Sequence, residues 1–267
     1  MRISKMELRY IFTRSSVWEQ YKEDKYSDFS LTLQANERFI CNWLSKAVRK
    51  LHIETSPQIK ALAFTHSPIE TSISIDFSEG IVHCNLLLSA TDQERLQQMS
   101  ILEDRYEFFL SYLERGYKEV SERIILPIDQ LLDLHDQFRQ NGYRNEWLFK
   151  KKMIREYGLY VFLKCYFTTF DFHLELEAYD LKQTRLIAKD IIFQSFPDEI
   201  CFSKDLRSIR VEGSKLQILN FLGKAEMAVD LEALTQGRVV VDYIDDDFLN
   251  WEERKESTRK AIERITW

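Results

Sequence analysis

Hydrophobic and polar residues alternate near the start of the chain and then change to helical spacing. Residues 6–12 place apolar side chains at every second position, and this period of two is typical of a half-buried strand. Between residues 33 and 51 the apolar residues return every three or four positions, as in an amphipathic helix. Alternation resumes at 59–65, 71–77 and 81–88, so three strands are expected there.

The last two of these strands form a predicted hairpin. A two-residue turn at Glu79–Gly80 would place Phe77 opposite Val82 and continue an apolar match along one face. A one-residue slip would destroy that match, because it turns every side chain to the other face of the sheet. In the predicted register, the polar face holds Asp76 opposite His83.

Helices are predicted through the middle of the chain. Thr91 and Glu94 have the spacing of a capping box. Apolar residues between Met99 and Ile124 then recur at spacings of three and four, which is the strongest helix signal in the sequence. A further helix is expected after Pro127, and a short helix at 145–157.

After Gly158 the pattern returns to alternation. A hairpin with its turn at Gly213–Ser214 places Glu212 opposite Lys215, and glycine at the first turn position favours a type II′ turn. The remaining predicted elements are strands at 159–179, 185–194 and 238–244 and a closing helix at 248–264.

This order of elements predicts an α+β fold, because runs of strands are separated by runs of helices. We expect two sheet-rich halves, with mostly antiparallel strands and hairpins, joined by a helical middle section. The predicted division is an N-terminal α+β unit at 1–125, a helical connector at 126–158 and a C-terminal antiparallel sheet with the closing helix at 159–267. No linker rich in Pro, Gly or Ser marks a boundary, so one continuous domain is the alternative.

Scarce glycine and dispersed cysteine exclude several familiar sites. The 267 residues include seven glycines, and their wide spacing leaves no GxGxxG motif, phosphate-binding loop or GxSxG elbow. The four cysteines form no CxxC pair, which removes the usual zinc-ribbon and thioredoxin-like patterns. We therefore expect no cofactor, and we expect buried, reduced thiols.

The charge of the chain favours a protein partner over nucleic acid. The formal net charge is −6, whereas duplex-binding domains usually have a basic excess that neutralises phosphates. The N-terminus shows no apolar signal segment, and no apolar run approaches the roughly 20 residues of a membrane-spanning helix. A cytoplasmic location without membrane contact is the expectation.

Two groups of residues are candidates for chemistry at a His/carboxylate site. Asp76 beside His83 would orient the imidazole and raise its basicity, as in general-base catalysis. Asp171, His173 and Glu175 share one face of a predicted strand, and such side chains can bind divalent cations. Alternate residues of a strand lie roughly 6.6–7 Å apart, so no metal site is expected from this strand, and a solvated face neutralised by Lys or Arg is the simpler interpretation.

A basic segment is the candidate for nucleic-acid binding. Aromatic residues are interleaved with its cations, a combination that single-strand binding proteins use for stacking and phosphate contact. The alternative is that the lysines lie on a solvated helix face while the aromatic residues face the core. The candidate residues are Arg144, Lys150, Lys151, Lys152 and Arg155.

Three classes of function remain open, and whether the protein is an enzyme stays undecided at this point. The preferred hypothesis is a non-enzymatic, cytoplasmic protein-binding module, such as a stoichiometric inhibitor or toxin-neutralising protein acting through an acidic surface. It rests on the absence of a catalytic motif and on aromatic-rich strands, since aromatic residues dominate many interfaces. The alternatives are an enzyme of unrecognised type using one of the His/carboxylate groups, and a nucleic-acid-associated protein using the basic segment.

Overall fold

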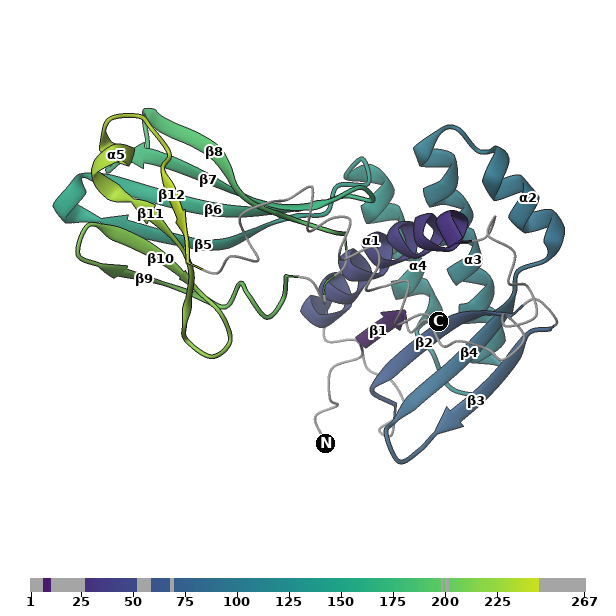
Figure 1. Cartoon of the computed structure of the whole chain (residues 1–267). Coiled ribbons are helices and arrows are strands. Elements are labelled where there is room, and N and C mark those ends of the chain that lie inside the picture. The colour runs from purple at the N-terminus through teal and green to yellow at the C-terminus, as the bar shows by residue number, and fades with distance from the viewer. Residues whose placement is uncertain are drawn as a thin grey trace. The chain divides into compact units, whose positions relative to one another are not determined.

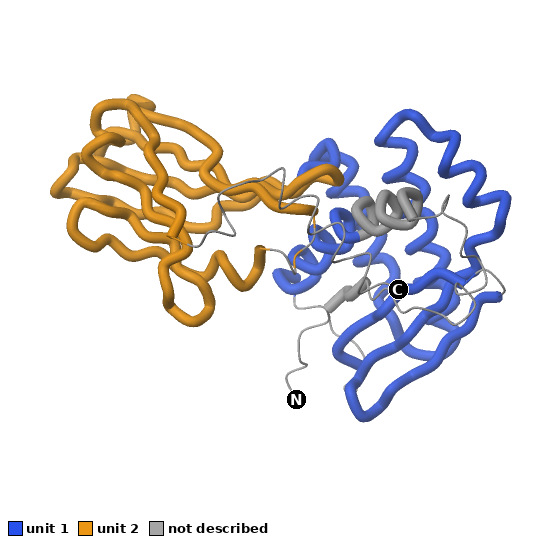
Figure 2. The backbone as a smooth tube through the Cα atoms, in the orientation of Figure 1, with its two compact units in different colours: residues 1–144 blue, residues 145–267 orange. Residues whose placement is uncertain are grey.

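The chain folds into two compact units, residues 1–144 and 145–267 (Figure 2). The computed structural model describes residues 7–10, 27–51, 59–67, 70–197, 199 and 202–244. The division lies inside the segment 126–158 that was predicted as a connector, because the helical part of that segment belongs to the first unit and the remainder to the second. Both units contain sheets, and the described helices of eight or more residues all lie in the first unit, so the α+β class is confirmed.

The first unit packs helices against one face of a four-stranded sheet (Figure 1). The strand order is β1-β2-β4-β3, with β1, β2 and β4 parallel and β3 antiparallel to β4. Its elements are β1 (Glu7–Tyr10), α1 (Ser27–Leu51), β2 (Ala61–Ser67), β3 (Ser72–Asp76), β4 (Ile81–Leu87), α2 (Ala90–Gln98), α3 (Leu102–Ser121) and α4 (Ile128–Gln140). The apolar stripes of α1, α3 and α4 meet the sheet in one core.

Helix α3 approaches the sheet closely at Gly116. A Cβ atom at this position would lie 2.5 Å from Cε1 of Phe64 and 2.9 Å from Cδ1 of Leu86. Both of these side chains are buried at the centre of the core. The absence of a side chain at Gly116 therefore sets how closely the helix packs on β2 and β4.

The β3–β4 hairpin forms, but its predicted register is wrong. Ile75 pairs with Val82 rather than with Cys84, and the turn contains the four residues Phe77–Gly80. The shift moves each pair by two positions. Apolar side chains consequently stay on the core face, which is why the hydrophobic pattern could not distinguish the two registers.

Hydrogen bonds from the loop to Asp76 account for the longer turn. Its Oδ1 accepts hydrogen bonds from the backbone N–H groups of Ser78 (2.9 Å) and Glu79 (3.1 Å). Gly80 has a φ of +70°, and its N–H donates to the carbonyl oxygen of Asp76 at 2.8 Å. An aspartate that bonds the backbone two residues ahead stabilises such a turn locally.

The capping box of α2 lies two residues before the predicted one. Ser89 Oγ accepts a hydrogen bond from the Asp92 backbone N–H at 3.1 Å, and Asp92 Oδ2 accepts one from the Ser89 N–H at 3.2 Å. The prediction of Thr91 and Glu94 as the capping pair is therefore wrong. Both pairs have the required spacing, but only the buried Leu88 separates Ser89 from the end of β4.

The second unit stacks two four-stranded antiparallel sheets (Figure 1). Their strand orders are β5-β6-β7-β8 and β12-β11-β10-β9, and one hydrophobic core is shared by their inner faces. The elements are β5 (Glu146–Ile154), η3 (Arg155–Tyr157), β6 (Leu159–Phe167), β7 (Phe172–Asp180), β8 (Leu186–Ser195), β9 (Ser208–Glu212), β10 (Lys215–Leu219), β11 (Ala225–Asp230), α5 (Leu231–Thr235) and β12 (Val241–Tyr243). The hairpin predicted at Gly213–Ser214 is confirmed, with Glu212 paired with Lys215 and a φ of +57° at Gly213.

The helix predicted at 145–157 is wrong, because most of this segment is strand β5. Trp147 and Phe149 pack against the core of the second unit, and the strand has a register shift between Leu148 and Lys150. Lys, Leu and Met are good helix formers, but pairing with β6 decides the structure here. After the short turn η3, Gly158 has a φ of +67°.

Three of the cysteines are described, and each is a buried, free thiol, as predicted: Cys41, Cys84 and Cys165. Cys201 and the closing helix predicted at 248–264 lie outside the described residues. Among the helices that the structure describes, none combines the length and apolar character needed to cross a membrane.

Candidate functional site

The structure does not place Asp76 opposite His83. Asp76 pairs with Ile81, and His83 pairs with Ser74. The pKa of Asp76 lies below its usual value, mainly because the Ser78 hydroxyl donates a hydrogen bond to the carboxylate, and the His83 charge is the smallest contribution. The carboxylate therefore stabilises the turn, and the predicted cross-strand pairing is wrong because the turn has four residues.

Asp171 and His173 lie together at the start of β7. Oδ2 of Asp171 is 3.4 Å from Nδ1 of His173, and the Thr168 hydroxyl donates to Oδ1 of Asp171 at 2.7 Å. The His173 ring stacks on Tyr166, with ring centroids 4.9 Å apart and planes inclined by 16°. One carboxylate is thus next to the imidazole, while the aromatic ring covers one of its faces.

Glu175 and the neighbouring Glu177 are bound to lysines from the adjacent strands. Lys189 Nζ is 2.9 Å from Glu175 Oε1 and 3.2 Å from Glu177 Oε1, and Lys164 Nζ is 2.6 Å from Glu177 Oε2. The glutamates are only 9% and 5% exposed, so this face is less solvated than expected, although lysines do neutralise it as predicted. Across the described residues, no group of three His, Cys, Asp or Glu side chains is arranged to hold a metal ion.

The pKa of Glu177 shows that these ion pairs outweigh burial. Burial raises the pKa of this carboxyl group, but hydrogen bonds from Lys164, Lys189 and Tyr179 together lower the pKa by a larger amount. The net pKa lies below the usual value. Glu177 is therefore ionised and paired with both lysines in the folded protein at neutral pH.

The basic segment does not form one stripe in the structure. Lys151 pairs with Phe162 on the face turned away from the core, whereas Lys150 and Lys152 pair with residues of the core-facing side. Because β5 is an edge of the described sheet, its lysines fit the role of charges that prevent pairing with another strand. The remaining candidates are separated from them: Arg155 lies in η3 and Arg144 in the first unit.

Four large apolar side chains are exposed on the outer face of the β5–β8 sheet, the face turned away from the second sheet. Leu148 pairs with Lys164, Met153 with Tyr160, Leu186 with Tyr179 and Ile191 with Glu175. All four therefore share one face with the lysine–glutamate pairs. Pairing across neighbouring strands places side chains on the same side of a sheet. The four are Leu148 (48% exposed), Met153 (44%), Leu186 (48%) and Ile191 (42%).

Aromatic rings occupy the middle of this outer face. Tyr160 and Phe162 have ring centroids 4.9 Å apart, and Phe162 meets Tyr179 edge-on at 5.7 Å. The Tyr166 hydroxyl donates to Glu175 at 3.1 Å. These rings are half-buried by one another and held on paired strands, so they form a preorganised amphipathic surface.

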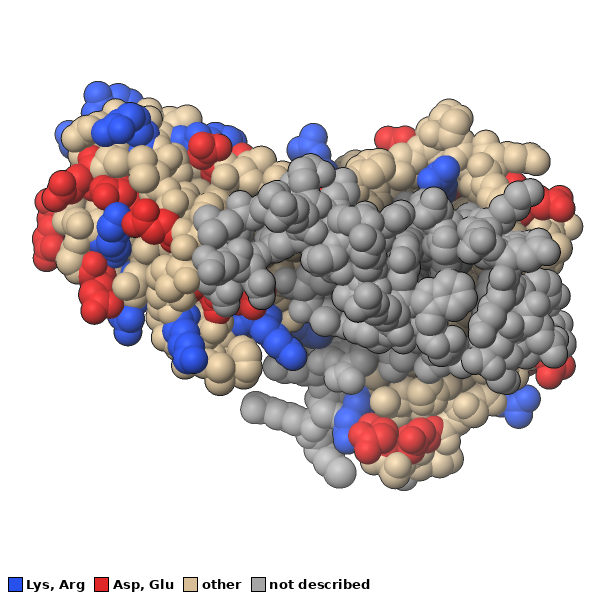
Figure 3. Space-filling model, viewed as in Figure 1, with Lys and Arg blue, Asp and Glu red and all other residues tan. Residues whose placement is uncertain are grey.

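Charge is mixed on the protein rather than gathered into one acidic region. Residues 1–144 contain 18 Lys or Arg and 21 Asp or Glu, and residues 145–267 contain 19 and 22, so each unit has a net charge of −3. Figure 3 shows acidic and basic side chains interspersed over the described part of the visible surface. The acidic excess therefore does not single out either unit.

A carboxylate, an imidazole and a hydroxyl also meet between α3 and α4, a cluster that no sequence motif had indicated. His135 Nδ1 is 3.2 Å from Glu114 Oε1, and His135 Nε2 is 3.1 Å from the Tyr117 hydroxyl. His135 and Tyr117 are fully buried, and burial lowers the pKa of His135 and raises the pKa of Tyr117. A substrate could not reach these groups, so the cluster satisfies polar side chains within the core.

The sequence indicated only part of the outer face. The segment predicted as one strand at 159–179 is the hairpin of β6 and β7, and β5 was predicted as a helix. Lys164 and Lys189 come from different strands, and only the register places both beside Glu177. The available signal was the alternation along residues 159–179, which assigns Glu175 and Glu177 to one side. Comparison with protein-family models, with curated proteins and with solved structures finds no match to this chain.

Proposed function

We propose that the protein is a non-enzymatic, cytoplasmic protein-binding module whose binding surface is the outer face of the β5–β8 sheet. The observation that supports this proposal is the set of four exposed apolar side chains around the half-buried aromatic rings. Interface cores are enriched in aromatic residues and Met and depleted in charge, with polar residues around them. A surface of this composition on a rigid sheet needs little ordering when it binds.

The state of the reactive side chains supports binding over catalysis. Burial raises the pKa of the Cys84 thiol to about 12, so the thiolate that acts as a nucleophile is rare at neutral pH. His135 and Tyr117 lie in the core, and the Asp76 carboxylate accepts the hydrogen bonds of a turn. Cys84, His135 and Tyr117 are thus closed to a substrate, and the accessible Asp76 carboxylate is engaged in stabilising the turn.

The chemistry of the outer face defines the partner. Its central glutamates are neutralised by Lys164 and Lys189, so an acidic surface alone does not describe it. We propose a folded protein partner that presents an apolar patch with charges of both signs at the rim. Association should depend weakly on salt, because paired charges steer a partner less than a field of one sign does.

Capture by the immobilised full chain from native-host extract tests this proposal. The wild-type chain should retain a near-stoichiometric protein, and the double variant Leu148→Asp/Ile191→Asp should reduce its affinity about 100-fold. Truncating one buried interface anchor typically costs more than about 1 kcal/mol, and about 1.4 kcal/mol corresponds to tenfold.

Phe221→Asp is the matched control, because Phe221 is 59% exposed in the second unit but lies in the turn between β10 and β11. This variant should bind as the wild type does. Circular dichroism and thermal unfolding confirm that each variant is folded. Absence of a stoichiometric partner, undiminished capture by the double variant, or an equal loss in Phe221→Asp would contradict the proposal.

A further inference from the structure

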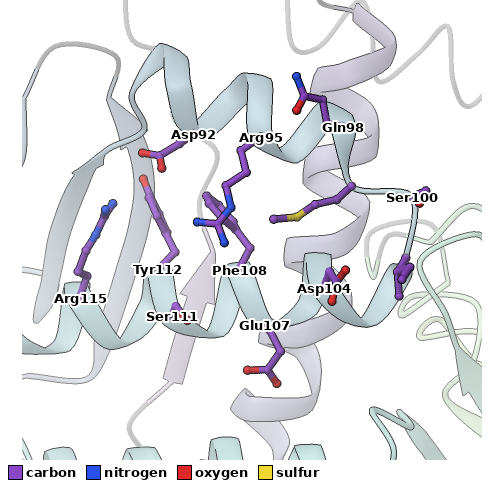
Figure 4. A pocket seen from close by; sticks show the side chains of 12 residues that line it. Asp92, Arg95, Gln98, Ser100, Asp104, Glu107, Phe108, Ser111, Tyr112 and Arg115 are labelled. Carbon is purple, nitrogen blue, oxygen red and sulfur yellow. The ribbon is translucent and has the colours of Figure 1, made fainter.

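A groove with a volume of about 670 Å³ lies between α2 and α3 in the first unit (Figure 4). Small-molecule sites commonly have volumes of roughly 300–1,000 Å³. Phe108 and Tyr112 line it from α3, stacked with ring centroids 6.3 Å apart and planes inclined by 19°. Met99 and Ile101 extend this apolar lining, and Ile101 is 56% exposed.

Arg95 supplies a positive charge over the apolar lining. Its side chain extends from α2 into the groove above Phe108 (Figure 4). Within the part of the chain that the structure describes, its guanidinium has neither a hydrogen-bond nor an ion-pair partner. Arg115 adds a second cation beside Tyr112, where it donates to the Leu87 carbonyl oxygen at 2.8 Å and lies 5.0 Å from the centroid of the Tyr112 ring.

The acidic side chains around the groove are engaged elsewhere or lie at its other end. Asp92 belongs to the capping box of α2. Glu107 binds Arg139 and accepts a hydrogen bond from Tyr143, and it points away from the groove (Figure 4). Asp104 is at the end opposite Arg115 (Figure 4), so the groove has a cationic half and an anionic end.

The tyrosine in the groove is not available for chemistry. The Tyr112 hydroxyl donates to the Leu86 carbonyl oxygen at 2.6 Å and lies 2.8 Å from Nδ1 of His66. With its proton donated to the backbone, the hydroxyl can accept the His66 N–H but has none left for a ligand. The groove is accordingly suited to binding.

We infer that this groove binds a carboxylate carried on an apolar group. The guanidinium of Arg95 matches a carboxylate in two parallel hydrogen bonds, while Phe108 and Ile101 contact the apolar part. Asp104 repels an anion at the opposite end, so the carboxylate is directed towards Arg95 and Arg115. The ligand is a free aromatic acid or the C-terminal residue of a peptide, which present the same chemistry. This inference is independent of the proposed function, because that surface lies in the other unit.

NMR titration of the full chain tests the site with two probes, 3-phenylpropionate and a tetrapeptide that ends in phenylalanine with a free carboxylate. At least one probe should shift amide resonances of α2 and α3 with a Kd below about 1 mM. Binding of phenylpropionate assigns the site to free acids, and binding of the peptide alone assigns it to C-terminal residues. The C-terminally amidated peptide should bind at least tenfold more weakly than the free peptide.

Arg95→Gln should weaken binding at least tenfold, and Phe108→Ala should also weaken it. Arg123→Gln is the matched control, since Arg123 is exposed and lies outside the groove, and it should leave the Kd unchanged. An unchanged spectrum outside α2 and α3 shows that each variant is folded. The inference is overturned if neither probe binds, if the amide binds as well as the acid, or if Arg95→Gln binds as the wild type does.

Discussion

Replacing Gly116 by valine is expected to destabilise the first unit by at least about 2 kcal/mol. The Cβ atom alone would lie 2.5 Å from the Phe64 ring and 2.9 Å from Leu86, and both neighbours are buried in a packed core. Extra atoms in a well-packed core typically cost about 1–3 kcal/mol. The better helix propensity of valine recovers less than about 1 kcal/mol of this loss.

Hydrogen exchange on the full chain measures this effect, because α3 and β4 should lose protection. Lys118→Val introduces the same side chain two residues later on the exposed side of α3, and it should change stability by no more than roughly 0.5 kcal/mol. Equal protection in Gly116→Val and wild type would show that the packing of α3 on the sheet tolerates a side chain at position 116.

Replacing both Lys164 and Lys189 by methionine is expected to destabilise the second unit by about 2–3 kcal/mol at pH 7. Glu175 and Glu177 would remain nearly buried without their cations. Breaking a buried ion pair costs about 3–5 kcal/mol, and we expect a loss at or below the lower end of this range because the lysine side chains are 36% and 45% exposed.

The pH dependence of stability should change sign in this variant. In the wild type the pKa of Glu177 is lowered, so its contribution to stability is present above the unfolded value of about 4.3 and is lost as the pH falls through the folded pKa. Without the lysines, burial raises the pKa of Glu177, and the folded protein then binds a proton more readily than the unfolded chain. Stability of the variant should therefore increase between pH 7 and pH 5.

Urea unfolding at pH 7, 6 and 5 compares the double variant with Lys151→Met. Lys151 is exposed on the same face, and its replacement should affect stability by less than about 0.5 kcal/mol at each pH. A double variant within about 1 kcal/mol of wild type at pH 7, or one whose stability does not increase between pH 7 and pH 5, would show that the lysines do not neutralise these carboxylates.

The fold was predictable where the sequence pattern had only one solution. The apolar spacing of α3 persists over five turns, and the turn at Gly213–Ser214 allows one register that pairs apolar residues on the core face. By contrast, β5 contains residues that favour helices, and its strand structure depends on pairing with β6. Because 145–157 was predicted as a helix, the predicted helical connector at 126–158 also extended across the boundary between the two units.

The candidate sites were less predictable because they depend on contacts between segments. Alternation along β7 correctly put Asp171, His173 and Glu175 on one side, but it could not show that Lys189 from β8 binds Glu175. The register of Asp76 and His83 failed because two pairings keep the same apolar face. The groove at Arg95 depends on the packing of α2 against α3, which no spacing within one segment specifies.

Side-chain footprinting with hydroxyl radicals, on the full chain alone and with its captured partner, tests the proposed binding surface most directly. We expect labelling of Leu148, Met153 and Ile191 to fall in the complex, while the exposed Phe77 and Phe221 remain labelled as in the free chain. Unchanged labelling across the outer face of the β5–β8 sheet, with protection elsewhere on the protein, would contradict the assignment of this face as the interface.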